Sequence, residues 1–283
     1  SMLSGTTINC LLVASETWVN EITPDASRGR VMGLYGTTMA AALACGPLII
    51  PLAGITGWTP FLIGAALIAI AAIPLFWATN VSPTMHGKAS FNPLSFAVIA
   101  PVMVAGVLLF SWKDSIASNL LPVFSVRSGL SQSGAATTLT VLGLGGVFLT
   151  YPVGILADRF NRYALMTLCG AGVGLLATLL PVVVGTSSYW LVLFFWGGLF
   201  SGLYTLILTI IGQRYRGIDL AIANVAIGAV FGVGTLTGPV LTGIAMDIWD
   251  PHGFAVVFAA FSLCFVIFSS LRWYLTPNKE VAL

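Results

Sequence analysis

The sequence predicts an all-α polytopic membrane protein with a bundle of about nine transmembrane helices. Hydrophobic residues make up 58% of the 283 positions and charged residues only 7%, whereas soluble domains contain about 25% charged residues. Apolar runs long enough to cross a bilayer follow one another along the whole chain. The few basic residues fall in alternate connections between those runs. The formal net charge of +2 gives no support for nucleic-acid binding.

A spanning helix needs about 20 predominantly apolar residues. Runs of this kind lie near residues 1–19, 29–52, 58–78, 96–124, 132–156, 162–184, 188–212, 218–246 and 254–274. They are too long and continuous for the alternating strands of a barrel. The longest polar connection divides the chain into a partial N-terminal half (residues 1–78, three spans), a central cytoplasmic linker (79–94) and a six-helix C-terminal half (95–283).

The cations indicate the orientation of the bundle. Alternating spans place nine of the eleven Lys and Arg residues on one side, namely Arg28, Arg30, Lys88, Arg159, Arg162, Arg214, Arg216, Arg272 and Lys279. Arg127 falls in a connection on the other side, and Lys113 lies inside a span. Because cytoplasmic loops carry the excess of Lys and Arg, we expect this side and the C-terminus to be cytoplasmic.

An internal repeat relates the two halves. Arg28-Gly29 begins a long Gly/Ala-rich run that contains Gly-Pro, and Arg216-Gly217 begins a similar run about 190 residues later. Transporter halves are related in this way, with an axis along the membrane normal. Because three spans precede the linker and six follow it, we expect three further spans before residue 1 in a symmetric twelve-helix parent. A genuine start at Met2 is the alternative.

The connection after the fifth span carries a recognisable motif. Residues 154–162 read GILADRFNR and resemble the signature G-x-L-a-D-r-x-G-R-[RK] of the major facilitator superfamily, with Asn161 and Tyr163 as departures. Residues 16–30 resemble the fourth helix and following loop of bacterial members catalogued as drug or metabolite efflux proteins. Residues 238–243 resemble the GP-x-x-x-G pattern of helix eleven. The resemblance therefore covers helices four to twelve of twelve.

The resemblance implies a secondary active transporter that moves a small molecule by alternating access. It also implies coupling to protons, a bacterial inner membrane and a monomer when the protein is full length. The alternative from another class is a truncated, non-transporting membrane fragment or regulator that needs a partner chain.

In the family, the signature aspartate pairs with arginine and faces the N-terminus of a neighbouring helix, where the dipole favours anions. The resemblance thus implies a cytoplasmic gate, whose expected members are Asp158, Arg159, Arg162, Arg28, Arg30 and Glu16. The alternative is that the charges after residue 157 only signal topology. Glu16 could carry a coupling proton or pair with Arg28 or Arg30, and we favour the ion pair.

Lys113 and Asp114 lie inside a span, where ionisable residues are costly and usually functional. The resemblance places them on helix seven, which lines the central cavity, and it places residues 188–212 on cavity-lining helix ten. Our candidate substrate-binding residues are Trp112, Lys113, Asp114, Asn119, Trp196 and Tyr204. The alternatives are that Lys113 and Asp114 stabilise a helix interface by neutralising each other or their neighbours, and that Trp196 and Tyr204 face lipid.

The sequence offers little for other chemistry. It contains no nucleophile–base pattern, phosphate loop or metal-ligand spacing, and its four cysteines lie inside apolar runs. We therefore expect no enzymatic activity, no cofactor and no metal. The expected partners are the small-molecule substrate, protons and the lipid bilayer.

Overall fold

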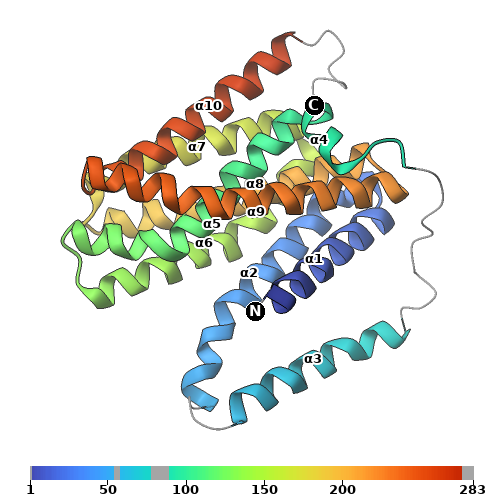
Figure 1. The fold of residues 1–283 in the computed structure, drawn as a ribbon, viewed down its shortest axis with the longest axis horizontal. Coiled ribbons are helices and arrows are strands. Elements are labelled where there is room, and N and C mark those ends of the chain that lie inside the picture. The colour runs from blue at the N-terminus through green and yellow to red at the C-terminus, as the bar shows by residue number, and fades with distance from the viewer. Residues whose placement is uncertain (1, 54–57, 78–88, 276–283) are drawn as a thin grey trace.

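The computed structural model describes the backbone of residues 2–53, 58–77 and 89–275, and the side chains of 10–42, 58–59, 62–73 and 89–275. Within these residues the regular structure is entirely helical, which confirms the predicted all-α fold (Figure 1). The helices are α1 (Met2–Ile22), α2 (Arg28–Ala53), α3 (Thr59–Trp77), α4 (Pro93–Ile99), α5 (Pro101–Arg127), α6 (Gln132–Arg159), α7 (Arg162–Val183), α8 (Ser188–Arg214), α9 (Gly217–Ile248) and α10 (Gly253–Leu275).

Length and composition identify the membrane-crossing helices. Among the described residues, α6 to α10 are each long and apolar enough to span a bilayer, and α4 with α5 adds a sixth span if the pair is counted as one. Helices α1, α2 and α3 occupy the first three predicted spans, and parts of their side chains lie outside the described residues. Large apolar side chains such as Ile68, Leu168 and Ile248 are well exposed on the surface, as lipid-facing helices require.

The predicted continuous span at 96–124 is wrong at its start. The chain forms the short helix α4, bends by 105° and then continues as α5 to Arg127. Pro101 has no backbone N–H, and it disfavours a helical conformation at the preceding residue. Ala100 accordingly has φ −129° and ψ 57°. Asn92 caps α4 by accepting a hydrogen bond from the Ser95 amide, so α4 has its own beginning.

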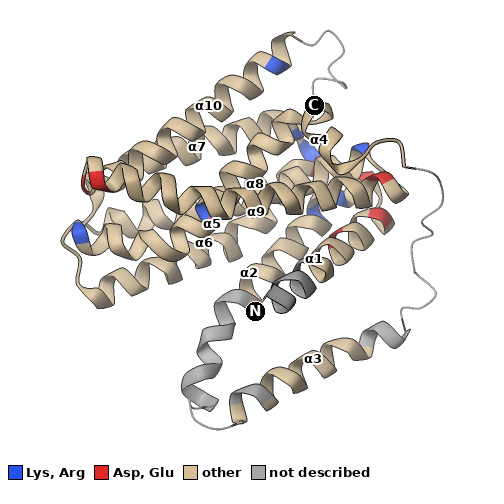
Figure 2. Cartoon of the chain, in the orientation of Figure 1, with Lys and Arg blue, Asp and Glu red and all other residues tan. Residues whose placement is uncertain are grey.

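The charges lie mainly at the two ends of the bundle, with Lys113 between them on α5 (Figure 2). Most of the described arginines lie at one end, which we name the arginine end: α1, α6, α8 and α10 finish there, and α2, α7 and α9 begin there. At the opposite end Arg127 pairs with Asp250 at 3.0 Å. Residues 78–88, and with them most of the predicted linker and Lys88, lie outside the described residues, as does Lys279.

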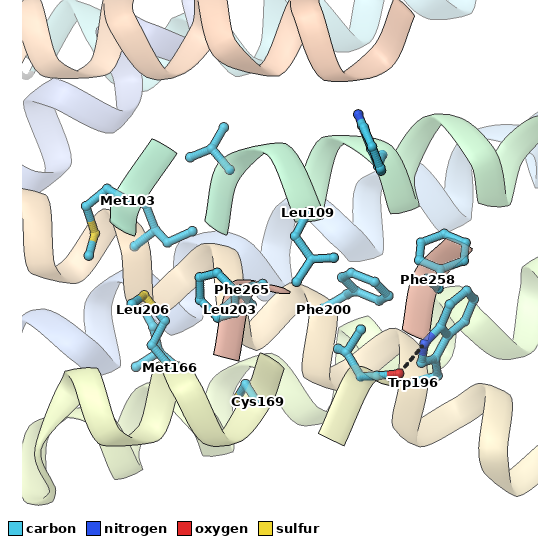
Figure 3. Close-up of a cluster of buried hydrophobic side chains, with 14 of the residues drawn as sticks. Met103, Leu109, Met166, Cys169, Trp196, Phe200, Leu203, Leu206, Phe258 and Phe265 are labelled. Carbon is cyan, nitrogen blue, oxygen red and sulfur yellow. Dashed lines mark hydrogen bonds between the residues drawn. The ribbon is translucent and has the colours of Figure 1, made fainter. Parts of the chain in front are cut away.

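The apolar core lies among α5, α7, α8 and α10 (Figure 3). Trp196 on α8 is fully buried, and its indole Nε1 donates a hydrogen bond to the Val173 carbonyl on α7 at 3.2 Å. Its ring packs edge-on against Phe200 and Phe258. Helices α1 and α2 pack on the other side of α8, where α1 also contacts α9 and α2 also contacts α6. Helix α8 is therefore central.

We expect Trp196→Ala to destabilise the bundle strongly. The change leaves a cavity and removes the hydrogen bond to the Val173 carbonyl, and such truncations of buried aromatics cost about 3–5 kcal/mol. Thermal unfolding of the purified protein in detergent measures the effect. Trp249→Ala is the matched control, because Trp249 is 59% exposed. An equal loss of stability in both variants would contradict the assignment of Trp196 to the core.

Candidate functional site

Asp158 at the end of α6 makes several contacts with a distant part of the chain. Its carboxylate accepts hydrogen bonds from the backbone amides of Gly29 (2.6 Å) and Arg30 (3.0 Å). These amides belong to the first turn of α2, whose N–H groups lack partners within the helix. The carboxylate also lies 3.4 Å from Arg30 Nε and 3.6 Å from Arg162 Nη2. Asp158 is thus an anion held at a helix N-terminus between two guanidinium groups.

Two glycines allow this contact. A Cβ atom at Gly154 on α6 would collide with the carbonyl oxygen of Gly29 and lie 3.0 Å from Gly33 Cα. A Cβ atom at Gly29 would collide with the Gly154 carbonyl and lie 2.6 Å from the Asp158 carboxylate. Helices α2 and α6 therefore meet backbone to backbone. The first glycine of the signature motif is needed here so that its aspartate can reach α2.

Arg28 occupies the centre of a second group of contacts at the arginine end. Its side chain is fully buried, and it donates hydrogen bonds to the backbone carbonyl of Asn20, to Asn20 Oδ1 at 2.9 Å and to the Thr23 carbonyl at 2.7 Å. Its Nε donates to Asp25 at 3.0 Å, and Asp25 also pairs with Arg216 at 3.0 Å. The hydrogen-bond donors of Arg28 are therefore paired with groups close to it in the sequence. Asp25, which it shares with Arg216, links the α1–α2 turn to the start of α9.

Glu21 makes a contact that corresponds to that of Asp158. It lies at the end of α1 and accepts a hydrogen bond from the Gly217 amide, the first residue of α9, at 3.0 Å. Gly217 and Gly29 are equivalent in the internal repeat, so each start of the repeated helix receives a carboxylate from another part of the chain. Glu21 was not among the residues predicted from the sequence, although the Arg-Gly repeat marks the helix start that it contacts.

The expected gate residues do not all come together. Arg162 pairs with Asp158 and also donates to Gln213 Oε1 at 2.8 Å and to the Asp25 carbonyl at 2.9 Å. Arg159, in contrast, is exposed and makes no ion pair or hydrogen bond within the part of the chain that the structure describes.

The favoured ion pair of Glu16 with Arg28 or Arg30 is wrong. Glu16 accepts a hydrogen bond from the Tyr204 hydroxyl on α8 at 2.9 Å and is only 5% exposed. It lies nearly two turns from the end of α1, and both arginines have partners nearer to them. Glu16 therefore belongs to the interior of the bundle rather than to the contacts at the arginine end.

The Glu16–Tyr204 contact falls on the axis that relates the two repeats. The two residues are 188 positions apart, the same separation as between Arg28 and Arg216. Asn20 Nδ2 donates to the Leu208 carbonyl at 2.7 Å, again across 188 positions. Residues that contact their own equivalents must lie beside a two-fold axis. The axis therefore runs between α1 and α8.

Other polar side chains lie near this axis. The hydroxyl groups of Ser15 and Tyr35 are 2.9 Å apart, and Asn224 on α9 donates to Thr17 Oγ1 at 2.8 Å. The Phe110 ring on α5 stacks on Tyr204, with 4.5 Å between ring centroids. Polar and aromatic groups from five helices therefore surround the middle of the bundle.

The four candidate substrate residues on α5 lie in different environments. Trp112 Nε1 donates to Thr237 Oγ1, and Ser115 Oγ donates to the Thr235 carbonyl, both at 2.9 Å, so these residues attach α5 to α9. Asp114 and Asn119 are exposed. Lys113 is mostly buried, with Nζ 5.5 Å from the Phe110 ring centroid and 5.9 Å from that of Phe200.

Among the six candidate substrate residues, Tyr204 and Lys113 share Phe110 as a neighbour. Trp112 attaches α5 to α9. Trp196 lies in the core, where its ring packs against Phe200, the second ring beside Lys113. No group of three His, Cys, Asp or Glu side chains suited to a metal occurs within the described ranges.

Comparison with known proteins identifies the class. The model of the Major Facilitator Superfamily matches residues 1–226 and 103–282, so the chain belongs to this family of membrane transporters. The uncharacterized MFS-type transporter YfkF of Bacillus subtilis is 24% identical over 249 residues, covering 84% of this chain and 62% of YfkF. Another relative, Ent638_1421 of Enterobacter sp., is 21% identical over 243 residues, covering 85% and 63%.

The MFS-type transporter pynF of Aspergillus niger is 27% identical over 199 residues, covering 68% of this chain and 45% of pynF. The chain thus spans less than two thirds of the length of these relatives.

We expect Gly154→Val to separate α2 from α6 and to lower the stability of the protein. Overpacking of a tight contact costs about 1–3 kcal/mol. The midpoint of thermal unfolding in detergent is the measurement. Gly143→Val is the control on the same helix, because a Cβ atom there meets nothing within 4 Å. If both variants melted at the wild-type temperature, the backbone contact between α2 and α6 would be refuted.

Proposed function

We propose that the full-length protein is a secondary active transporter that moves a small molecule by alternating access. Residues 1–78 and 95–283 form its two moving parts, and residues 79–94 connect them. The observation that carries the proposal is the Asp158 contact, which joins the second part to the first through charge-assisted hydrogen bonds at one end of the bundle. Such contacts can break and re-form when the two repeats rock against each other as rigid bodies.

The same contacts form the proposed cytoplasmic gate. Asp158, Arg30 and Arg162 meet at the start of α2, and Glu21 meets the start of α9. Arg28 holds the turn on which this arrangement is built. The excess of Lys and Arg at this end supports a cytoplasmic location, and hence a cytoplasmic C-terminus in a bacterial inner membrane.

Substrate and proton binding are proposed for the region beside the repeat axis, where such sites lie in transporters built from repeats. Tyr204 and Lys113 supply polar groups to this region, and Phe110 lies against both. Asp114 and Asn119 are exposed on the same helix as Lys113. Glu16 meets a neutral hydroxyl rather than an arginine, so it can exchange a proton without breaking an ion pair. We therefore assign the coupling proton to Glu16.

Flux measurements with the full-length protein in proteoliposomes test the proposal. Substrate libraries are screened under an inward and an outward pH gradient, with Lys113→Ala and Asp114→Asn as variants in the proposed binding region. We expect gradient-dependent flux of at least one compound class and a raised KM in both variants. Absence of flux under every gradient would reject transport and favour the alternative, a non-transporting membrane fragment or regulator that needs a partner chain.

We expect Asp158→Asn to open the arginine end more often. Loss of an anion at a helix N-terminus costs about 1 kcal/mol, which corresponds to a shift of about fivefold in the equilibrium. The readout is maleimide labelling of a Thr150→Cys reporter, which is 1% exposed on α6, in a background without the native cysteines. Arg159→Gln is the control, because it removes the neighbouring charge, which is exposed and makes no ion pair within the described residues. Equal labelling rates in the two variants would argue against a gate at Asp158.

We expect Glu16→Gln to abolish accumulation driven by a pH gradient while substrate exchange continues. Glutamine keeps the shape of the side chain but cannot carry the proton. Accumulation and counterflow in the same vesicles separate the two processes. Tyr204→Phe is the comparison, because it removes the hydrogen bond and leaves the carboxyl group. Undiminished gradient-driven accumulation by Glu16→Gln would assign coupling elsewhere.

A further inference from the structure

Lys113 is a buried cation near the middle of α5, between the charged ends of the bundle. Its side chain is only 9% exposed. Its Nζ lies 5.5 Å from the centroid of the Phe110 ring and 5.9 Å from that of Phe200, and the side chain makes no ion pair or hydrogen bond with any residue that the structure describes. Ionisable groups inside a membrane pair with another charge or mark the path of a substrate. The Lys113 ammonium is therefore free to bind an anion.

Two acidic residues belong to the same region, but neither pairs with Lys113. Asp114 follows it on α5, where successive side chains point about 100° apart, and Asp114 is exposed. Glu16 accepts a hydrogen bond from the Tyr204 hydroxyl at 2.9 Å, and the Tyr204 ring stacks on Phe110. Phe110 is thus a neighbour of both the ammonium and the phenol that contacts Glu16. The buried cation and the buried carboxylate of this region are separate charges rather than an ion pair.

The other groups around Lys113 are aromatic. Phe110 and Tyr204 are nearly parallel, with 16° between the ring planes and 4.5 Å between centroids. The Phe231 ring on α9 lies 6.0 Å from that of Phe110. Ligand sites are lined mainly by apolar and aromatic side chains, with a few polar groups that fix the orientation of the ligand. Rings from α5, α8 and α9 beside a single ammonium suit a ligand that has one anionic group and a flat apolar body.

We propose that the substrate is a planar organic monoanion, such as an aromatic carboxylate, whose anionic group binds the Lys113 ammonium. This inference rests on the transport function proposed above and names its substrate class. The body of the substrate packs against Phe110 and the rings beside it. A cationic substrate is disfavoured because it would meet Lys113. A dianion is disfavoured because Glu16, the other buried ionisable group of this region, is acidic and offers its second charge no partner.

Calorimetric titration of the full-length protein in detergent tests the substrate class. The probes share one ring system and differ in charge: naphthoate, uncharged naphthamide, naphthylmethylammonium and naphthalene dicarboxylate. We expect naphthoate to bind about tenfold more tightly than naphthamide, which is the effect of one charge-assisted hydrogen bond, and more tightly than the cation or the dianion. Lys113→Met keeps an unbranched side chain without the charge, and it abolishes the preference for naphthoate over naphthamide. Lys113→Arg retains that preference.

Two further variants separate charge from ring contacts. Phe110→Leu weakens the binding of naphthoate and naphthamide equally and leaves their ratio unchanged. Arg159→Gln is the control for diffuse attraction, because it removes an exposed cation at the arginine end, and it changes neither affinity. The proposal is overturned if Lys113→Met keeps the wild-type ratio. The wild-type protein alone also decides the matter, since failure to bind naphthoate, or tighter binding of naphthamide or naphthylmethylammonium, would overturn the proposal.

These titrations need no membrane gradient, so their outcome is independent of the flux measurements. Gradient-dependent flux of other compounds without naphthoate binding would reject the substrate class and leave the transporter intact. Binding of naphthoate that depends on Lys113, without flux of any compound in vesicles, would support the anion site and reject transport.

Discussion

One carboxylate at one helix N-terminus joins α6 to α2 at the arginine end of this bundle. Asp158 reaches the amides of Gly29 and Arg30 because Gly154 and Gly29 let two helix backbones touch. A side chain at either glycine would displace the carboxylate from the amides it caps. Packing and electrostatics therefore depend on each other here. The close approach of α2 and α6 positions the Asp158 carboxylate, and the hydrogen bonds to this carboxylate stabilise the close approach. Arg30 and Arg162 further stabilise this carboxylate, which the N-terminus of α2 already stabilises.

The internal repeat gives this end of the molecule its organisation. Each copy of the Arg-Gly helix start meets a carboxylate from elsewhere, Asp158 at α2 and Glu21 at α9. The two carboxylates are not equivalent in sequence, since one ends α6 and the other ends α1. Deeper in the bundle the repeat produces contacts between true equivalents, as between Glu16 and Tyr204. Glu16 and Tyr204, which occupy equivalent positions in the two repeats, therefore lie on either side of the axis.

The surrounding bilayer explains the rest of the surface. Large apolar side chains are exposed on the spanning helices, while most charged residues lie at the two ends of the bundle (Figure 2). Two residues depart from this pattern: Lys113 lies between two phenylalanine rings, and Arg214 has a buried Nη1 with no hydrogen-bond partner among the described residues. In a medium without water such groups need partners from protein, substrate or lipid.

Hydropathy and the placement of arginines determined the helical membrane class and most helix bounds, because the bilayer imposes a length and a polarity on every span. The signature motif indicated Asp158 and Arg162. The sequence could not assign the partner of each side chain. Glu16 accepts a hydrogen bond from Tyr204 rather than pairing with an arginine, and Trp196 is packed in the core. Arg159 makes none of the expected gate contacts. Nor did hydropathy reveal the bend before Pro101, since composition is the same on both sides of it. Those outcomes depend on which helix faces are brought together, and only tertiary packing decides that.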